Sequence, residues 1–551
     1  MRIFFFNLLC LITTGALAST LPAPVSHALR DAHIPLSSVS IVVQQTDAAQ
    51  PLVSLNADRA INPASTMKLL TTIAALETLG PAYRWKTEAY LDGKLENGVL
   101  QGNLVFKGYG DPKLTVEEFW LWLHEMRQRG LREIRGDIVL DHSFFKAVRQ
   151  NPGKFDHDPN RAYNVGTNAL LLNFNALHIH LIPDGRATRA LLVPDLDGYK
   201  LVNRITTSRR LHCGGRDAYK AHLDGHNIVL EGSIPAGCGE TDDYFSLLPQ
   251  DEYFFAVFSA LWKQLGGTVQ GQLREGVAPA GQAPFARYVS PPLAEVIRDI
   301  NKFSNNTMAR QLFLTLGMAE QADANQGSVF SMPLALGEDS LQARQEGGDA
   351  TSPKDADLVP DTRPSVGPGA GADPPAAPAG GTPKAGNLLS SKLDTELTPP
   401  AGAPLLRTDP PAANIARSTA VIRQWLRAQQ LHFPELVVEN GAGLSRKARI
   451  SARHIADLLQ RVMDSPFHAE LESSLPILGI DGTVKRRFRD SDMAGYAHLK
   501  TGTLHGVKSI AGYVKAHDGK QWIVVFIVNN RNAALAGPAQ DALIEWLQKE
   551  H

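Results

Sequence analysis

The sequence predicts an α+β protein whose antiparallel sheet is built from both ends of the chain, has helices on both faces and is interrupted by a β-rich inserted module. Three observations support this fold class. Strand patterns occur early, at residues 39–45 and 52–55, and again late, at 509–516 and 522–529. Helical patterns accompany both pairs of strands. Short strands and turns dominate the intervening stretch 85–285.

The first 18 residues have the pattern of a cleaved secretory signal. Arg2 supplies a positive start, an apolar stretch follows, and Ala16-Leu17-Ala18 is a small-residue cleavage site. The apolar run is short for a bilayer, and no later stretch reaches about 18 apolar residues. We favour an exported chain that begins at Ser19, without a transmembrane segment, over a membrane anchor, a buried helix or a lipoprotein attached through Cys10. If the cell is Gram-negative, the compartment is the periplasm.

Two cysteines remain after signal removal, Cys213 and Cys238. In an exported chain such a pair favours a disulfide, with two free thiols as the alternative. The formal net charge of −1 gives no electrostatic argument for nucleic acid as a partner. His178 and His180 alternate on an expected strand and are interpreted as part of a solvated face. Since no Cys or His cluster has ligand spacing, neither a metal nor a cofactor is expected.

The first chemical signal is a serine three residues before a lysine, Ser65 and Lys68. Apolar residues recur at helical spacing over 69–76, which predicts a buried helix that brings the hydroxyl and the amine to one side. A lysine of lowered pKa can take the proton of a serine nucleophile. Ser143 and Lys146 have the same spacing, but they follow a strand and are interpreted as structural.

The second half of the chain begins with two apolar helical patterns separated by Ser304-Asn305-Asn306. Polar residues at such a junction are either caps or site residues. Residues 321–413 are rich in Pro, Gly, Ala, Ser and Asp, which predicts a disordered linker or a long surface loop. A neutral insertion is favoured over a tether to the cell wall or to a partner. Order returns with five expected segments: helix 415–428, strand 436–439, tight loop 440–446, helix 451–463 and helix 538–549. The strands 509–516 and 522–529 are read as edge-like.

Three motifs now stand in order: Ser65-x-x-Lys68, Ser304-x-Asn306 and Lys500-Thr501-Gly502. This trio is known from class A β-lactamases and penicillin-binding proteins. Further matches are Pro63-Ala64, Gly110-Asp111-Pro112, residues 136–141, Gly441-x-Gly443-Leu444-Ser445-Arg446 and Asp481-Gly482-Thr483. With them, the chain resembles the class C low-molecular-mass penicillin-binding proteins of type 4. These are the D-alanyl-D-alanine carboxypeptidases and endopeptidases of peptidase family S13.

The resemblance covers nearly the whole mature chain except the linker. It departs from the family at Asn440, where Asp is usual, and in the length of the insertion 321–413. It implies a serine β-lactamase/transpeptidase-like domain made of residues 19–84 and 286–551. Residues 85–285 would form the inserted module, as one domain or two nested ones. The implied substrates are peptidoglycan stem peptides that end in D-Ala-D-Ala or carry D-Ala cross-links. β-Lactams would be covalent inhibitors.

The resemblance also implies roles for individual residues. Ser65 would form the acyl-enzyme, Lys68 would act as its base, and Ser304 would relay a proton to the leaving amine. Substrate binding falls to Asn306, Lys500, Thr501, Gly502 and Thr503. Backbone N–H groups of Ser65 and Thr503 would form the oxyanion hole. Two rival functions remain, a β-lactamase-like hydrolase and a non-catalytic exported scaffold that binds the cell wall.

Overall fold

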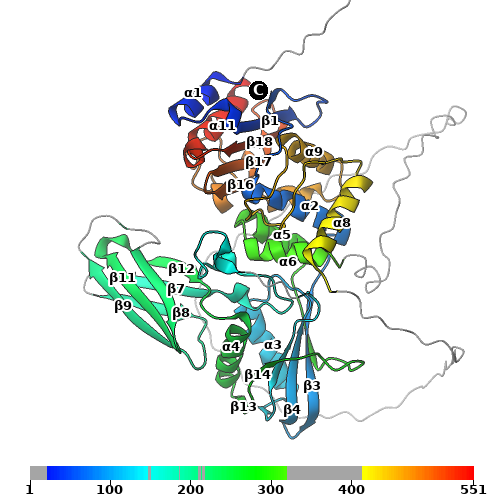
Figure 1. Cartoon of the computed structure of the whole chain (residues 1–551), viewed down its shortest axis with the longest axis vertical. Coiled ribbons are helices and arrows are strands. Elements are labelled where there is room, and N and C mark those ends of the chain that lie inside the picture. Colours follow the sequence, from blue (N-terminus) through cyan, green and yellow to red (C-terminus); the bar gives the residue numbers. More distant parts are fainter. Residues whose placement is uncertain (1–20, 147–150, 185–186, 209–212, 214–217, 319–411) are drawn as a thin grey trace, which may run out of the picture. The chain divides into compact units, whose positions relative to one another are not determined.

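A five-stranded antiparallel sheet contains both ends of the chain, in the order β16-β17-β18-β1-β2 (Figure 1). The structure, a computed structural model, describes residues 21–146, 151–184, 187–208, 213, 218–318 and 412–551. The five strands are β1 (Val39–Gln45), β2 (Val53–Leu55), β16 (Ala497–Leu504), β17 (Val507–Lys515) and β18 (Gln521–Asn529). Val39 of β1 lies opposite Val528 of β18. The predicted sheet from both chain ends is therefore confirmed.

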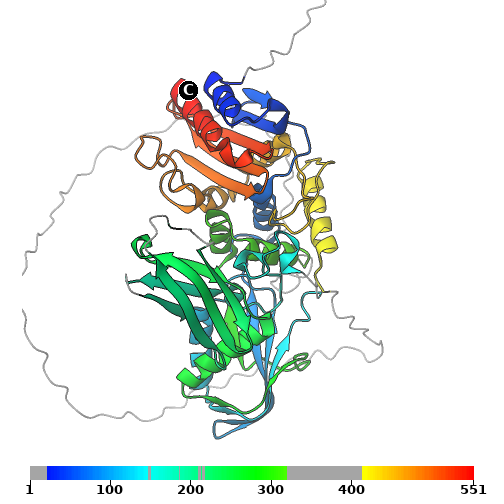
Figure 2. The same ribbon diagram turned by 60° about the vertical axis from the view of Figure 1, so that its left-hand side comes forward.

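Apolar side chains of β18 point alternately to the two faces of this sheet, and helices cover both faces. Val524 and Phe526 pack on one side with α1 (Ala23–Asp31) and α11 (Gly537–Glu550). Ile523 and Val525 point to the other side, into the core that contains α2 (Met67–Leu79) and α9 (Ala452–Met463). Successive side chains of a strand face opposite sides, so a continuous apolar run suits a central strand. In both views α1, in blue, and α11, in red, lie side by side (Figures 1 and 2).

Two details of the sequence prediction are wrong here. β17 and β18 are interior strands, because their apolar residues are buried on both faces, and the edge strands are β16 and β2. The expected strand 436–439 is a single bridge between Val437 and Arg449. Its chain turns away at once through Gly441 and Gly443, both at positive φ, so no longer ladder forms.

The remaining elements of this domain place the site residues. They are the 3₁₀ turns η2 (Ala64–Thr66) and η8 (Gly482–Val484) and the helices α5 (Leu293–Lys302), α6 (Asn306–Leu316), α8 (Ile415–Ala428) and α10 (His468–Ser474). The expected signal 1–18 lies outside the described residues, and so does the expected linker apart from its last two residues. Ala413 is buried and forms a bridge with Phe145, so the linker ends earlier than predicted.

The described residues between 85 and 290 form three further sheets. A seven-stranded sheet contains β3 (Lys86–Glu96), β4 (Val99–Gly108), β5 (Glu133–Ile134), β6 (Ile138–Asp141), β13 (Thr268–Val269), β14 (Leu273–Glu275) and β15 (Ala286–Val289). It packs with α3 (Val116–Gln128) and α4 (Gln250–Gln264), two helices within a stretch that was predicted as β-rich.

Two three-stranded sheets complete this stretch. One is β12 (Thr241–Phe245), β7 (Leu177–Pro183) and β8 (Thr188–Val193), and the other is β10 (Tyr219–Asp224), β11 (Asn227–Pro235) and β9 (Lys200–Ser208). They share a small core that includes Ile179, Leu181 and Leu230. A disulfide joins Cys213 to Cys238, just before β12. Among the described residues, no helix has the length and apolarity of a membrane span.

The interior position of β18 makes a stability prediction. Phe526 is fully buried between the sheet and the α1–α11 face, so Phe526→Ala leaves a cavity. We expect a loss of about 3–5 kcal/mol in the free energy of unfolding, measured by urea denaturation. The control Leu535→Ala changes a side chain that is 58% exposed, and should stay within about 0.5 kcal/mol. Equal effects of the two variants would contradict the burial argument.

Candidate active site

The half-buried Ser65 sits on the turn η2, directly before α2, and this turn is held from several directions. The preceding residue, Ala64, has a φ of 50°, a left-handed conformation that a non-glycine residue keeps only when its surroundings fix it. Asn62 Oδ1 accepts a hydrogen bond from Ala64 N at 2.9 Å, and Asn62 Nδ2 donates to Ser445 O at 2.8 Å. The side chain of Asn529 bonds both backbone groups of Asn62. The turn is thereby fixed to the end of β18.

The edge strand β16 runs against the serine turn at Gly502. A Cβ atom at Gly502 would lie 2.8 Å from Ser65 N and 2.3 Å from Ser509 Oγ. Ser509 Oγ in turn donates to Pro63 O at 2.7 Å. Any larger residue would push β16 away from Ser65, which is the physical reason for a glycine in the Lys-Thr-Gly motif.

Lys68 is fully buried and its amine contacts three separate segments. Lys68 Nζ lies 3.0 Å from Ser65 Oγ, 2.6 Å from Asn306 Oδ1 and 2.7 Å from Ala442 O. A neutral amine has two N–H groups and one lone pair. It can donate to the two carbonyl oxygens and accept from the serine hydroxyl. Burial, with Lys500 and then Arg310 as positive neighbours, holds the pKa of Lys68 well below its usual range.

Ser304 and Lys500 form a second pair. Ser304 lies between α5 and α6 with a φ of 56°, and Lys500 Nζ donates to its Oγ at 2.9 Å. Burial lowers the pKa of Lys500 to about 7. The neighbouring Asn305 caps α6 by accepting from Met308 N, so the capping interpretation holds for this member of the trio. Asn306 instead reaches Lys68.

The carbonyl of Ala442 is a site group that sequence reasoning missed. Asn440 shapes its loop, because Oδ1 accepts from Ala442 N at 3.0 Å and Nδ2 donates to Leu444 O at 2.9 Å. A Cβ atom at Gly443 would lie 1.9 Å from Ala64 O, so the loop also touches the serine turn. The residue type of Ala442 carries no chemical signal. The glycines on either side were the only available indication.

A second missed residue is Thr483, whose hydroxyl accepts a 2.7 Å hydrogen bond from Thr501 Oγ1. It was noted only as part of a family motif. The turn η8 that carries it is anchored by the ion pair between Lys302 and Asp481, at 2.7 Å. Thr503 is exposed, two residues further along β16. The strand therefore presents hydroxyl groups next to Lys500.

The helix α6, which carries Asn306, is braced by the loop before β7. Gln311 accepts from Asn168 N at 3.1 Å and donates to Asn168 O at 2.7 Å. Arg310 donates to Val165 O at 2.6 Å. By contrast, Ser143 and Lys146 are both exposed on a turn after β6, in agreement with their structural interpretation.

Comparisons with known proteins agree on one family. The model of the "D-Ala-D-Ala carboxypeptidase 3 (S13) family" matches residues 21–336 and 409–550. A D-alanyl-D-alanine carboxypeptidase of Actinomadura sp. (strain R39) is 24% identical over 547 residues, which cover 96% of this chain and 85% of the relative. The D-alanyl-D-alanine carboxypeptidase DacB of Haemophilus influenzae is 19% identical and covers 90% of this chain and 85% of its own length.

A solved structure has the same fold. Penicillin binding protein 4 of Haemophilus influenzae superposes with a TM-score of 0.66 at 18% identity, over 95% of this chain and 99% of that one. At this identity the likeness establishes the fold alone. It confirms the predicted fold class, a transpeptidase-like domain with an insertion.

The hydrogen bonds of Asn62 to the serine turn lead to a second stability prediction. Asn62 is 5% exposed, and Asn62→Ala leaves Ala64 N and Ser445 O without their partner. Each orphaned group should cost about 1–3 kcal/mol in the free energy of unfolding, measured by urea denaturation. A loss below about 0.5 kcal/mol would mean that the turn does not depend on this side chain.

Proposed function

The chain belongs to the D-Ala-D-Ala carboxypeptidase 3 (S13) family, and we propose that it hydrolyses the D-Ala-D-Ala bond of peptidoglycan stem peptides and D-Ala cross-links through an acyl-enzyme on Ser65. Membership makes it a type-4 low-molecular-mass penicillin-binding protein and a serine-type hydrolase. The observation that carries the proposal is the buried amine of Lys68, 3.0 Å from the hydroxyl of Ser65. A neutral amine in this position is a ready base.

Acylation begins when Ser65 Oγ attacks the carbonyl carbon between two D-alanines. The proton of the hydroxyl passes to Lys68 as the new C–O bond forms. The resulting oxyanion would be stabilised by the backbone N–H groups of Ser65 and Thr503, each worth roughly 3 kcal/mol. The close approach of β16 at Gly502 supports this role, because it brings the strand to Ser65 N.

Breakdown of the tetrahedral intermediate needs a proton on the leaving amine. Two contacts support Ser304 as the group that relays this proton from Lys68: its hydroxyl accepts a hydrogen bond from Lys500, and Asn306, two residues further along the chain, contacts Lys68. The C–N bond breaks, and the amine leaves with the relayed proton. Water then attacks the ester on Ser65, and release of the stem peptide restores the hydroxyl.

Substrate recognition would use the groups along β16. A terminal carboxylate next to Lys500 favours the protonated amine, and so raises a pKa that burial has lowered to about 7. The hydroxyls of Thr501 and Thr503 would complete the clamp, with Thr483 fixing Thr501. Asn306 would hold the substrate amide. A β-lactam would acylate Ser65 in the same way, as a covalent inhibitor.

We infer that the protein is exported and, in a Gram-negative cell, works in the periplasm. The signal-like residues 1–18 support this, together with the disulfide between Cys213 and Cys238. Disulfides persist mainly in oxidising compartments. Peptidoglycan, the proposed substrate, lies in the same space.

Labelling with a fluorescent penicillin tests the nucleophile. We expect the wild type to be labelled and Ser65→Ala to lose all labelling, since no oxygen remains to form the acyl bond. Ser143→Ala is the matched control, because it alters the other serine of the same spacing, and it should label normally. Mass spectrometry should show loss of D-Ala from a pentapeptide, or cleavage of a cross-linked dimer, in wild type and Ser143→Ala only. Labelled Ser65→Ala would refute the assignment.

The pH dependence of acylation tests the coupling of the two lysines. The Lys500→Ala variant removes a positive neighbour, so the pKa of Lys68 rises and its neutral form appears only at higher pH. The acid limb of the acylation rate should therefore move to higher pH. Burial, the larger cause of the lowered pKa, remains in the variant. The rate itself should fall by roughly 10- to 100-fold through the lost anion contact.

Lys515→Ala, which removes an exposed charge from β17, is the control for this experiment. It should leave the pH profile unchanged. An acid limb at the wild-type position in Lys500→Ala would contradict the coupling, even if the rate were lower.

A further inference from the structure

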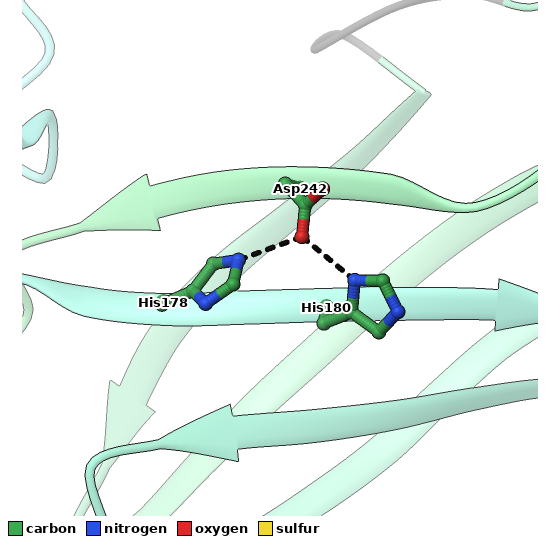
Figure 3. Close-up of side chains that lie close together, drawn as sticks. All are labelled: His178, His180 and Asp242. Carbon is green, nitrogen blue, oxygen red and sulfur yellow. Dashed lines mark hydrogen bonds and ion pairs between the residues drawn. The ribbon is translucent and has the colours of Figure 1, made fainter. Parts of the chain in front are cut away.

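Two histidines and an aspartate converge on the solvent-facing side of the β12-β7-β8 sheet (Figure 3). His178 and His180 are two residues apart on β7, so both point away from Ile179, which lies in the core of the two three-stranded sheets. Asp242 of β12 lies opposite His180 in the antiparallel register. Strand alternation and strand pairing therefore bring three potential ligands together.

The three side chains already point at one position. Asp242 Oδ1 lies 2.7 Å from His178 Nε2 and 2.7 Å from His180 Nδ1. The ligand atoms all lie within 4.8 Å of one another. In a tetrahedral zinc site with bonds of about 2.0–2.2 Å, ligand atoms are roughly 3.3 Å apart. Small rotations of the exposed Asp242 and the half-buried His178 and His180 would supply the difference.

Two neighbours hold the imidazole rings in orientation. Glu240 Oε2 lies 3.5 Å from the other ring nitrogen of His180, Nε2. A carboxylate is one of the common partners of the second ring nitrogen of a metal-binding histidine, beside backbone carbonyls and water. The ring of Tyr244 stacks on His178, with 4.7 Å between centroids. The disulfide at Cys238 anchors the segment that leads to Glu240.

We propose that His178, His180 and Asp242 bind a divalent transition-metal ion, with Zn²⁺ as the best fit and water in the remaining position. Imidazole nitrogens with a carboxylate suit Zn²⁺, whereas Mg²⁺ and Ca²⁺ prefer oxygen ligands only. Asp242 is 54% exposed on its side chain, which leaves access for the ion and for water. The ion would tie β12 to β7. The proposal replaces the sequence-based interpretation of this pair as a solvated face, and it is independent of the proposed activity.

Isothermal titration with Zn²⁺ alone tests the site, with the full chain prepared free of metal. We expect one Zn²⁺ per chain, and a loss of affinity of about 100-fold or more in the double variant His178→Asn, His180→Asn, which removes two ligands. Asp242→Asn should also weaken binding, while Glu240→Gln should cost about 10-fold through the orientation of His180. His222→Asn, on β10 in the same stretch, is the control and should bind normally. Mg²⁺ should give no binding at this site.

Folding is checked in chelator, where the urea midpoint of each variant should equal that of the wild type, because the changed side chains are on the surface. Zn²⁺ should raise the midpoint of the wild type and of His222→Asn, but not that of the double variant. Equal Zn²⁺ affinity in wild type and double variant would overturn the proposal. So would a wild type that binds no Zn²⁺. If the double variant unfolds at a lower urea midpoint in chelator, the Zn²⁺ affinity of Asp242→Asn is compared with that of the wild type instead. Equal affinities would then overturn the proposal.

Discussion

The buried amine of Lys68 is the constraint on which the catalytic domain depends. A buried ammonium without a counter-ion costs several kcal/mol, so burial lowers the pKa of Lys68 and favours its neutral amine. Its two N–H groups and its lone pair then require three partners, and these come from the serine turn, the start of α6 and the loop at Ala442. The close approaches at Gly443 and Gly502 are consequences, since three segments and a strand edge must meet around one side chain.

Much of the fold was predictable, because strands and helices leave local patterns of apolar residues in the sequence, with a period of two in strands and of three to four in helices. The pairing of early and late strands followed from their position in the chain and was confirmed. The errors come from tertiary context. An apolar run such as β18 does not reveal by itself whether one or two faces are covered, and β16 carries polar residues that hide its strand character. The stretch around Val437 has strand-like residues but only one partner, Arg449.

The candidate site was predictable where short sequence motifs contain the reactive side chains, as at Ser65, Ser304 and Lys500. The structure brings these motifs together through direct hydrogen bonds, although hundreds of residues separate them. The carbonyl of Ala442 could not be found this way, because every residue has a carbonyl. The cluster of His178, His180 and Asp242 was equally hidden, since its third member depends on strand register rather than on spacing along the chain.

The pairing of β1 with β18 also means that the sheet can fold only after the C-terminal segment has been synthesised. Asn62, next to the serine turn, depends on Asn529, 467 residues later. The sheet therefore cannot close, and the serine turn cannot take its final conformation, until the last segment has been synthesised and, in an exported protein, translocated. Contacts of such long range are slow to form. The conformation of the serine turn is therefore completed only when the last strand of the sheet is in place.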